Sequence, residues 1–159
     1  MSNLKKVQIY TDGACSGNPG KGGYGVILNF NGIKKEISEG FLLTTNNRME
    51  ILAAIKGLEA LKEKCSVTLY SDSKYLVDAI NKDWVKKWKS NNWVKSDKSK
   101  AKNIDLFSRL LNLLDMHEVE FIWVKGHAGH TENERCDHLA TSAILKDNLS
   151  VDEGFTNEE

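Results

Sequence analysis

Two stretches of alternating apolar residues, joined by Asn31 and Gly32, constrain the fold of this chain more than any other feature. The alternation runs from Tyr24 to Phe30 and resumes from Ile33 to Phe41. An Asn-Gly pair between two such runs indicates a tight hairpin, because both turn residues need a positive φ. Val7 to Asp12 has the same period, and the glycine-rich residues 13 to 23 are expected to end that strand. The chain therefore opens with three predicted strands, the second and third antiparallel.

Helical and strand patterns alternate after this hairpin. Apolar residues have helical spacing from about Asn46 to Lys62, and Ser73 is a good N-cap for another helix. The remaining predicted elements are a strand over Val67 to Asp72, a short helix and loop in the lysine-rich segment, a helix over Ile104 to Leu114, a strand over Val119 to Lys125, and a last helix opened by a capping box at Thr131-x-x-Glu134. This order predicts an α/β fold, a five-stranded mixed sheet whose first three strands are antiparallel, flanked by about five helices.

Composition indicates one globular domain. The chain has 159 residues, of which 40% are hydrophobic. No run approaches the roughly 18 apolar residues of a membrane span, and no apolar stretch follows Lys6 as a secretory signal requires. The three cysteines are widely spaced, which is typical of reduced thiols. We expect a monomeric cytoplasmic protein with no membrane partner.

The zero net charge hides an uneven distribution. Eight lysines and only two acids lie between Lys82 and Lys102, whereas the segment from Asp147 carries five acids and no base. The basic segment indicates a polyanionic partner, although lysines also commonly solvate a surface helix. We expect residues 1–147 to form one domain with a basic protrusion at about 82–102. Residues 148–159 are expected to be a disordered acidic tail, whose role in binding a protein partner stays open.

Four acidic residues stand near the ends of predicted elements. Asp12 closes the first strand, Asp72 closes the fourth, and Glu50 lies in the first turn of the first long helix. Asp137 sits one position from the inward stripe of the last helix. Taken singly, each has an ordinary explanation as a turn, cap or rim residue, and Asn47-x-x-Glu50 matches a capping box.

Taken together, the four acids predict a metal site. Crowded carboxylates repel and take up protons unless a cation neutralises them. Oxygen ligands without paired His or Cys favour Mg²⁺ or Mn²⁺, and two such ions roughly 4 Å apart would clamp a phosphodiester for hydrolysis. Zinc is the alternative, because His127, His130, Cys136 and His138 include its ligand types. No CxxC pair supports a structural zinc site, however.

Four sequence blocks resemble bacterial ribonuclease H of type 1, in order, between about Lys6 and Leu145. The blocks are Tyr10-Thr-Asp-Gly-Ala-Cys-Ser-Gly-Asn-Pro-Gly20, Thr45-Asn-Asn-Arg-Met-Glu-Ile51, Tyr70-Ser-Asp-Ser-Lys-Tyr75, and Trp123-Val-Lys-Gly-His-Ala-Gly-His130 followed by Asn133-Glu-Arg-Cys-Asp137. The resemblance implies a ribonuclease H-like fold. It also implies an endonuclease that hydrolyses the RNA strand of RNA–DNA hybrids with two metal ions, leaving 5′-phosphate and 3′-hydroxyl ends.

The resemblance implies roles for individual residues as well. Asp12, Glu50, Asp72 and Asp137 match the four carboxylates that hold two Mg²⁺ ions, for which Mn²⁺ is a possible substitute. His127 matches a loop histidine associated with proton movement or product release, and an imidazole switches protonation near neutral pH.

Substrate-binding residues follow from the same resemblance. Glu50 and the backbone near Cys15 would recognise the 2′-hydroxyl that distinguishes RNA from DNA. The other implied contacts are Asn18, Asn46 and Asn47 in the minor groove, Lys74 where many members have glutamine, Thr45 and Asn103 around a DNA-strand phosphate, and Lys86, Lys87, Lys89 and Trp93 in the basic protrusion along the DNA strand. Trp84 and Trp88 belong to the same protrusion and are expected mainly to pack, and Asn103 is also a plausible N-cap.

Two other functions remain possible at this point. An integrase-like or transposase-like nuclease could share the fold, although the basic protrusion and the block Thr45 to Ile51 argue against it. A non-catalytic hybrid-binding module is the second alternative. Such a module would be expected to have lost at least one carboxylate, and this chain keeps all four.

Overall fold

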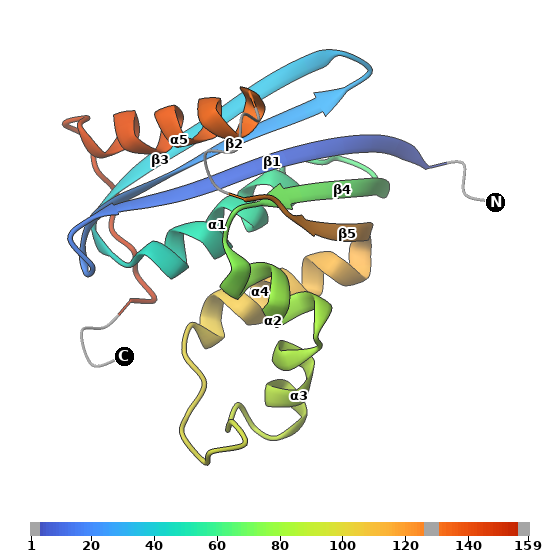
Figure 1. Cartoon of the computed structure of the whole chain (residues 1–159), viewed down its shortest axis with the longest axis vertical. Helices are drawn as coiled ribbons and strands as arrows, with labels where there is room; N and C mark the ends of the chain where they lie inside the picture. Colours follow the sequence, from blue (N-terminus) through green and yellow to red (C-terminus); the bar gives the residue numbers. More distant parts are fainter. Residues whose placement is uncertain (1–3, 126–130, 156–159) are drawn as a thin grey trace.

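The computed structural model describes residues 4–125 and 131–155, which form a five-stranded mixed sheet with helices on both faces (Figure 1). The strand order is β3-β2-β1-β4-β5. The strands are β1 (Lys5–Ser16), β2 (Gly20–Phe30), β3 (Ile33–Thr44), β4 (Cys65–Ser71) and β5 (Glu118–Trp123). β1, β2 and β3 are antiparallel, whereas β4 runs parallel to both β1 and β5. The predicted mixed sheet is confirmed.

The β2–β3 hairpin forms where the sequence predicts it. Phe30 pairs with Ile33, and the two residues between them, Asn31 and Gly32, have φ values of 51° and 83°. Both values lie in the left-handed region that this two-residue turn requires. Local turn chemistry therefore sets the register of the hairpin.

The prediction that residues 13 to 23 end the first strand is wrong. β1 continues to Ser16 and β2 already begins at Gly20, so most of this glycine-rich segment lies within the sheet. The glycines instead let helices approach the strands closely. A Cβ atom on Gly13 would lie 2.6 Å from the Glu50 amide nitrogen, and one on Gly23 would lie 2.6 Å from the Ala140 carbonyl oxygen.

The described residues form five helices, most of which pack on the sheet. They are α1 (Asn46–Glu59), α2 (Lys74–Asn81), α3 (Trp84–Ser90), α4 (Ile104–Met116) and α5 (Thr131–Ile144). α1 packs on β1 and β2 and against α4, whereas α5 covers the opposite face of β1 and β2 (Figure 1). Ser73 caps α2 as predicted, because its hydroxyl accepts a hydrogen bond from the Leu76 amide at 3.2 Å. α1 ends at Glu59 rather than near Lys62, since the chain turns there and the Leu61 amide bonds to the Leu58 carbonyl.

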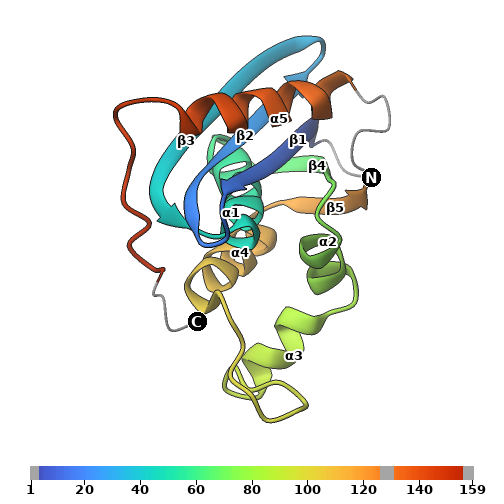
Figure 2. The ribbon, with the colours of Figure 1, turned by 60° about the vertical axis from the view of Figure 1, so that its left-hand side comes forward.

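The lysine-rich segment projects away from the sheet. α3 and the loop that follows it lie at the end of the molecule farthest from the hairpin (Figures 1 and 2). Its tryptophans join it to the core: the Trp88 and Phe107 rings form a T-shaped pair with 6.1 Å between ring centres. Trp84 and Trp93 are likewise partly buried against the core, so the predicted packing of Trp84 and Trp88 is confirmed.

The prediction of a disordered tail is wrong for residues 148–155. The Leu42 amide donates to the Ser150 carbonyl at 2.9 Å, and the Ser150 amide donates to the Gly40 carbonyl at 2.8 Å. β3 is an edge strand with unpaired backbone groups, and the tail pairs with them. Over the described residues, no helix has both the length and the apolar character needed to cross a membrane.

Candidate active site

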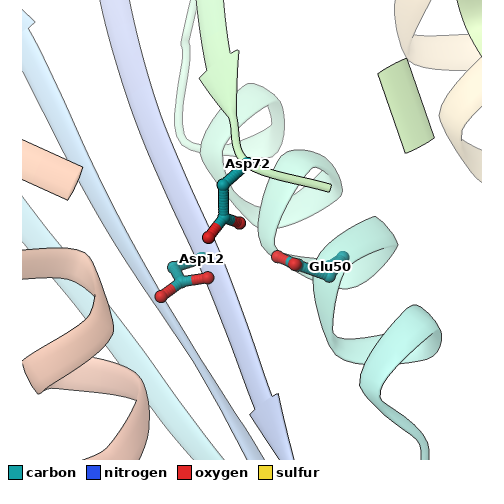
Figure 3. A group of neighbouring side chains, drawn as sticks. All are labelled: Asp12, Glu50 and Asp72. Carbon is teal, nitrogen blue, oxygen red and sulfur yellow. The ribbon is translucent and has the colours of Figure 1, made fainter. Parts of the chain in front are cut away.

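Three acids from three different elements meet at one edge of the sheet (Figure 3). Asp12 belongs to β1, Asp72 follows β4, and Glu50 projects from α1 toward both. One carboxylate oxygen of each lies within 4.8 Å of the others. The three carboxylates are therefore close enough to act together as ligands of one cationic centre.

Strand pairing accounts for the meeting of the two aspartates. β1 and β4 are parallel, and Thr11 pairs with Ser71, so the next residue of each chain segment emerges at the same level. The prediction that Asp12 closes the first strand is wrong, because β1 continues to Ser16. The two aspartates instead meet at the carboxyl end of β4, and such strand ends are where sheets of this kind commonly place their sites.

Glu50 reaches the aspartates because α1 lies close to β1 at Gly13. The alternative that Glu50 completes a capping box with Asn47 is wrong. Thr45 is the N-cap of α1, and its hydroxyl accepts from the Arg48 amide at 3.2 Å. Glu50 is 4% exposed and is directed at the acids.

The electrostatics of this cluster favour protonation when no cation is bound. Burial raises the pKa of the Asp12 carboxyl to about 9, and the nearby charges of Asp72 and Asp137 reinforce the shift. Burial and the charge of Asp12 also raise the pKa of Glu50 well above its ordinary value of 4.5. Within the described part of the chain, Glu50 Oε1 and Asp72 Oδ1 are buried and accept no hydrogen bond. Buried oxygens without donors suit a hard divalent cation.

A test of these electrostatics compares the natural chain with Asp12→Asn in EDTA. A carboxyl whose folded pKa is raised stabilises the fold fully below about pH 4 and loses that contribution as the pH rises through about 9. The melting temperature of Asp12→Asn should therefore exceed that of the natural chain by a margin that grows with pH. At pH 8 the margin should reach about 3–10 °C, since an unsatisfied buried group costs about 1–3 kcal/mol.

Thermal unfolding followed by circular dichroism at pH 5, 7 and 9 measures this margin. Asp115→Asn is the matched control, because Asp115 is exposed and lies outside the acidic cluster. A margin that stays constant over this pH range would contradict the assigned electrostatics.

Asp137 borders the same centre from the other face of the sheet. It belongs to α5 and lines an open cleft of about 510 Å³ that also contains Asp12, Glu50 and Asp72. Its oxygens lie outside the tight group of three, although its charge acts on Asp12. The structure therefore brings all four predicted acids to one cleft, three of them in close contact.

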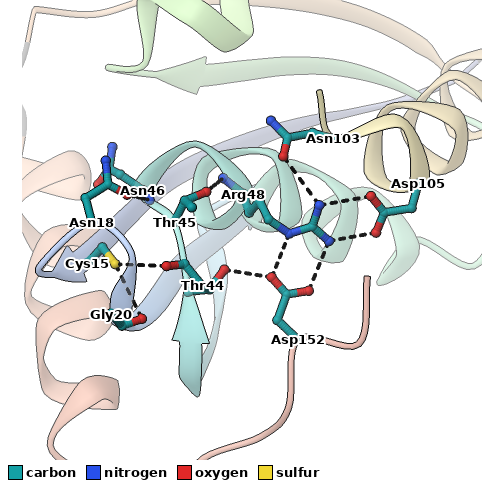
Figure 4. Close-up of polar contacts among 10 residues, drawn as sticks. All are labelled: Cys15, Asn18, Gly20, Thr44, Thr45, Asn46, Arg48, Asn103, Asp105 and Asp152. Atoms are coloured by element: carbon teal, nitrogen blue, oxygen red, sulfur yellow. Dashed lines mark hydrogen bonds and ion pairs between the residues drawn. The ribbon is translucent and has the colours of Figure 1, made fainter. Parts of the chain in front are cut away.

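Most of the predicted RNA-contacting residues lie at this cleft, and Figure 4 shows three of them, Cys15, Asn18 and Asn46, near one another. Cys15, Asn46 and Asn47 line the cleft, and Asn18 lies beside them. The Asn18 side-chain oxygen accepts from the Asn46 amide at 3.1 Å, which ties the β1–β2 turn to the start of α1. The Cys15 thiol donates to the Thr44 carbonyl at 3.5 Å, which joins β1 to the end of β3.

Lys74 lines the cleft as well, and here the structure adds a residue that the sequence did not single out. The Lys74 ammonium lies 5.6 Å from the ring centre of Trp123, and the Trp123 indole N–H donates to the Asp72 carbonyl at 3.2 Å. Trp123 is the last residue of β5 and remains 46% exposed. A tryptophan near the end of the predicted strand Val119 to Lys125 was the available sequence signal for it.

Three further predictions concern the last loop and helix. His127 and His130 lie outside the described residues, so the role of His127 stays a prediction. Thr131 is the first residue of α5, and the N-cap position before it also lies outside that range. Cys136 is buried and its thiol donates to the Tyr10 carbonyl at 3.3 Å, which argues against the zinc alternative.

The predicted DNA-strand contacts lie apart from the acids. Lys86, Lys87 and Lys89 are exposed on α3. A second cavity of about 590 Å³ lies between α2, α3 and α4 and includes Lys86 and Lys89. Asp115 is the only acid among the described residues that line it, so it lacks the carboxylate cluster of the acidic cleft. Asn103 occupies the N-cap position of α4 yet makes no capping hydrogen bond, because its side chain is directed at Arg48.

Comparison with known proteins identifies the family. The family model described as RNase H matches residues 4–145. The chain belongs to the RNase H family. A Ribonuclease H from Rippkaea orientalis is 63% identical over 154 residues, which cover 97% of this chain and 94% of the relative.

Solved RNase H structures have the same fold. LC9-RNase H1, described as a type 1 RNase H with the type 2 active-site motif, superposes with a TM-score of 0.83 at 30% identity, covering 94% of this chain and 77% of that one. LC11-RNase H1 in complex with an RNA/DNA hybrid superposes with a TM-score of 0.69 at 25% identity, covering 87% and 96%.

Proposed function

We propose that this chain is an endonuclease that hydrolyses the RNA strand of RNA–DNA hybrids and leaves 5′-phosphate and 3′-hydroxyl ends. The observation that carries the proposal is the cluster of Asp12, Glu50 and Asp72 in an open cleft. Membership of the RNase H family supports the reaction class, and a solved relative is described in complex with an RNA/DNA hybrid.

The acidic cleft suits two Mg²⁺ ions, for which Mn²⁺ is a possible substitute. Asp12, Glu50, Asp72 and Asp137 would hold these ions, which supply Lewis-acid charge and lower the pKa of an attacking water. The protein side chains then have two tasks. The four carboxylates would keep their oxygens at fixed positions on separate elements of secondary structure, and the side chains on the rims of the cleft would orient the hybrid so that its scissile phosphate lies at this centre.

Substrate selection is assigned to the two sides of the cleft. Glu50 and the backbone near Cys15 recognise the RNA 2′-hydroxyl, with the amides of Asn18, Asn46 and Asn47 along the minor groove. Lys74, which lines the same cleft, is proposed to contact the substrate there as well. The DNA strand then runs over Thr45 and Asn103 to the protrusion, where Lys86, Lys87 and Lys89 meet phosphates, Trp84 braces the helix and Trp93 meets a deoxyribose.

We further propose that the protein acts as a monomer in the cytoplasm. Its three cysteines are free thiols, as in proteins of a reducing compartment. Among the described residues the large exposed apolar side chains fall at the two ends of β3 (Ile33, and Leu42 with Leu43) and singly elsewhere (Met116, Trp123, Leu145 and Val151).

The decisive experiment presents one labelled 20-mer as RNA–DNA hybrid, duplex RNA, duplex DNA and single-stranded RNA, each with Mg²⁺ and with EDTA. We expect metal-dependent cleavage of the hybrid's RNA strand alone. Cleavage of duplex DNA would assign the chain to another nuclease class of this fold. Tight hybrid binding without cleavage would make it a binding module.

A further inference from the structure

Arg48 is a fully buried arginine whose guanidinium is enclosed by acids from two distant parts of the chain (Figure 4). Its Nη1 and Nη2 donate to the two Asp105 oxygens at 2.9 and 2.6 Å. Its Nε and Nη2 donate to the two Asp152 oxygens at 2.7 and 3.0 Å. Both contacts are bidentate, which fixes the plane of the guanidinium as well as its position.

The same arginine touches both residues proposed to hold a DNA-strand phosphate. The Arg48 amide donates to the Thr45 hydroxyl at 3.2 Å, and Arg48 Nη1 donates to the Asn103 side-chain oxygen at 3.4 Å. The second contact orients the Asn103 amide so that its NH₂ group points away from Arg48, toward the Tyr75 hydroxyl at 3.4 Å. Arg48 is therefore the physical link between the start of α1 and the start of α4.

The tail holds this link in place. The Asp152 side chain is only 7% exposed, and it also accepts from the Thr44 hydroxyl at 2.7 Å. Ser150 anchors the tail beside β3 through its backbone and through a hydroxyl bond of 2.7 Å to Glu39. Gly154 lets the chain lie against the cluster, since a Cβ atom there would be 2.8 Å from Arg48 Nη2.

The charges around Arg48 explain why Asp105 and Asp152 must hold its guanidinium in place. The two carboxylates of Asp105 and Asp152 carry more negative charge than the guanidinium carries positive charge. Arg48 therefore does not bind a phosphate through its own charge. The phosphate would instead meet neutral groups, the Thr45 hydroxyl and the Asn103 amide. Neutral donors bind well only at correct distance and angle, so their affinity depends on how firmly Arg48 is held.

We propose that residues 148–155 are a positioning element for substrate, in which Asp152 holds Arg48 so that Thr45 and Asn103 keep the geometry of a DNA-strand phosphate site. Asp152 acts through Arg48 and does not touch the substrate. The inference rests on the proposed function, because the phosphate belongs to the hybrid.

The test is a scan of hybrids that carry one neutral methylphosphonate at successive DNA-strand positions. For the natural chain, a methylphosphonate at one position should raise KM about tenfold, the loss expected for a hydrogen bond to a charged group. This fold-increase in KM is called the penalty below. Thr45→Ala with Asn103→Ala should abolish this penalty. Asp152→Asn should raise KM for the unmodified hybrid about three- to tenfold, leave kcat within about twofold, and reduce the penalty at that position to under about threefold.

Two further variants separate positioning from general stability. Glu59→Gln is the matched control, since the bidentate Glu59–Arg109 pair also joins α1 to α4 and makes no contact with Arg48 or Asn103 among the hydrogen bonds of the described residues. It should retain the full penalty. Thr44→Val removes one hydrogen bond to Asp152 and keeps the ion pair, so it should shift the penalty in the same direction by less, even if Asp152→Asn fails to fold.

Each outcome decides the matter. If Asp152→Asn kept the full penalty, the tail would have a purely stabilising role and the inference would be overturned. Should Asp152→Asn not fold, the same result in Thr44→Val would overturn it. An equal loss of penalty in Glu59→Gln would do the same. If the variant with Thr45→Ala and Asn103→Ala kept the penalty, both the phosphate site and the positioning role of Asp152 would be overturned. The proposed cleavage of hybrids would not be affected by that result. Absence of hybrid cleavage by the natural chain would instead refute the proposed function.

Discussion

Asp12→Asn is expected to lower kcat for cleavage of the RNA strand by at least about a thousandfold, because a missing carboxylate ligand removes several kcal/mol of charge stabilisation in the transition state. Asp12 lies at the centre of the site, within reach of both Glu50 and Asp72. The fold should persist, since asparagine has nearly the same size and the natural carboxyl is already costly to bury.

Single-turnover cleavage of a labelled hybrid in excess Mg²⁺, with circular dichroism to verify folding, measures this loss. Asp115→Asn serves again as control, because it removes an exposed acid and should cleave at the natural rate. Cleavage by Asp12→Asn within about tenfold of the natural rate would rule out this acid as a metal ligand.

Replacing Lys86, Lys87 and Lys89 together by alanine is expected to weaken hybrid binding and reduce its dependence on salt. These lysines are exposed on α3, which projects from the sheet (Figure 2). Removing one lysine–phosphate interaction should flatten the slope of log K against log salt by about 0.7–0.9, so removing all three would change it by about 2–3.

Fluorescence anisotropy between 50 and 200 mM salt (about the range over which such interactions are screened) measures the slope. The Asp12→Asn background keeps the hybrid intact during the titration. The matched control replaces three exposed lysines outside the protrusion, Lys62, Lys64 and Lys146, by alanine. If the two triple variants had the same slope of log K against log salt, the lysines of α3 would only solvate a surface helix.

Local sequence signals were sufficient for much of the fold. The hairpin at Asn31 and Gly32 needs only two residues with positive φ between alternating runs, and these signals act over a few residues. The N-cap at Ser73 is local in the same way. Glycines misled the prediction between residues 13 and 23, because their role there is to admit helices that are distant in sequence.

The acids illustrate the limit of sequence reasoning at the site. Their positions near element ends predicted a joint role, and the resemblance supplied specific pairings. Only the parallel pairing of β1 with β4 aligns Asp12 with Asp72, and only the close approach of α1 at Gly13 brings Glu50 to them. The local sequence fits a capping role for Glu50 as well as a metal-binding role. The hydrogen bond from the Arg48 amide to the Thr45 hydroxyl excludes the capping role, because it makes Thr45 the N-cap.

The sequence by itself determined the fold class, because strand period and turn residues are legible within short segments, and its four motif blocks were enough for the resemblance that indicated the family. The tertiary structure alone decided the place of the C-terminal segment. Its acids and lack of lysine or arginine predict disorder when the segment is considered in isolation. In the fold, a buried arginine requires carboxylate partners, and Asp152 supplies one from 104 residues away. Such a contact depends on which surfaces the folded chain brings together, and no local pattern records it.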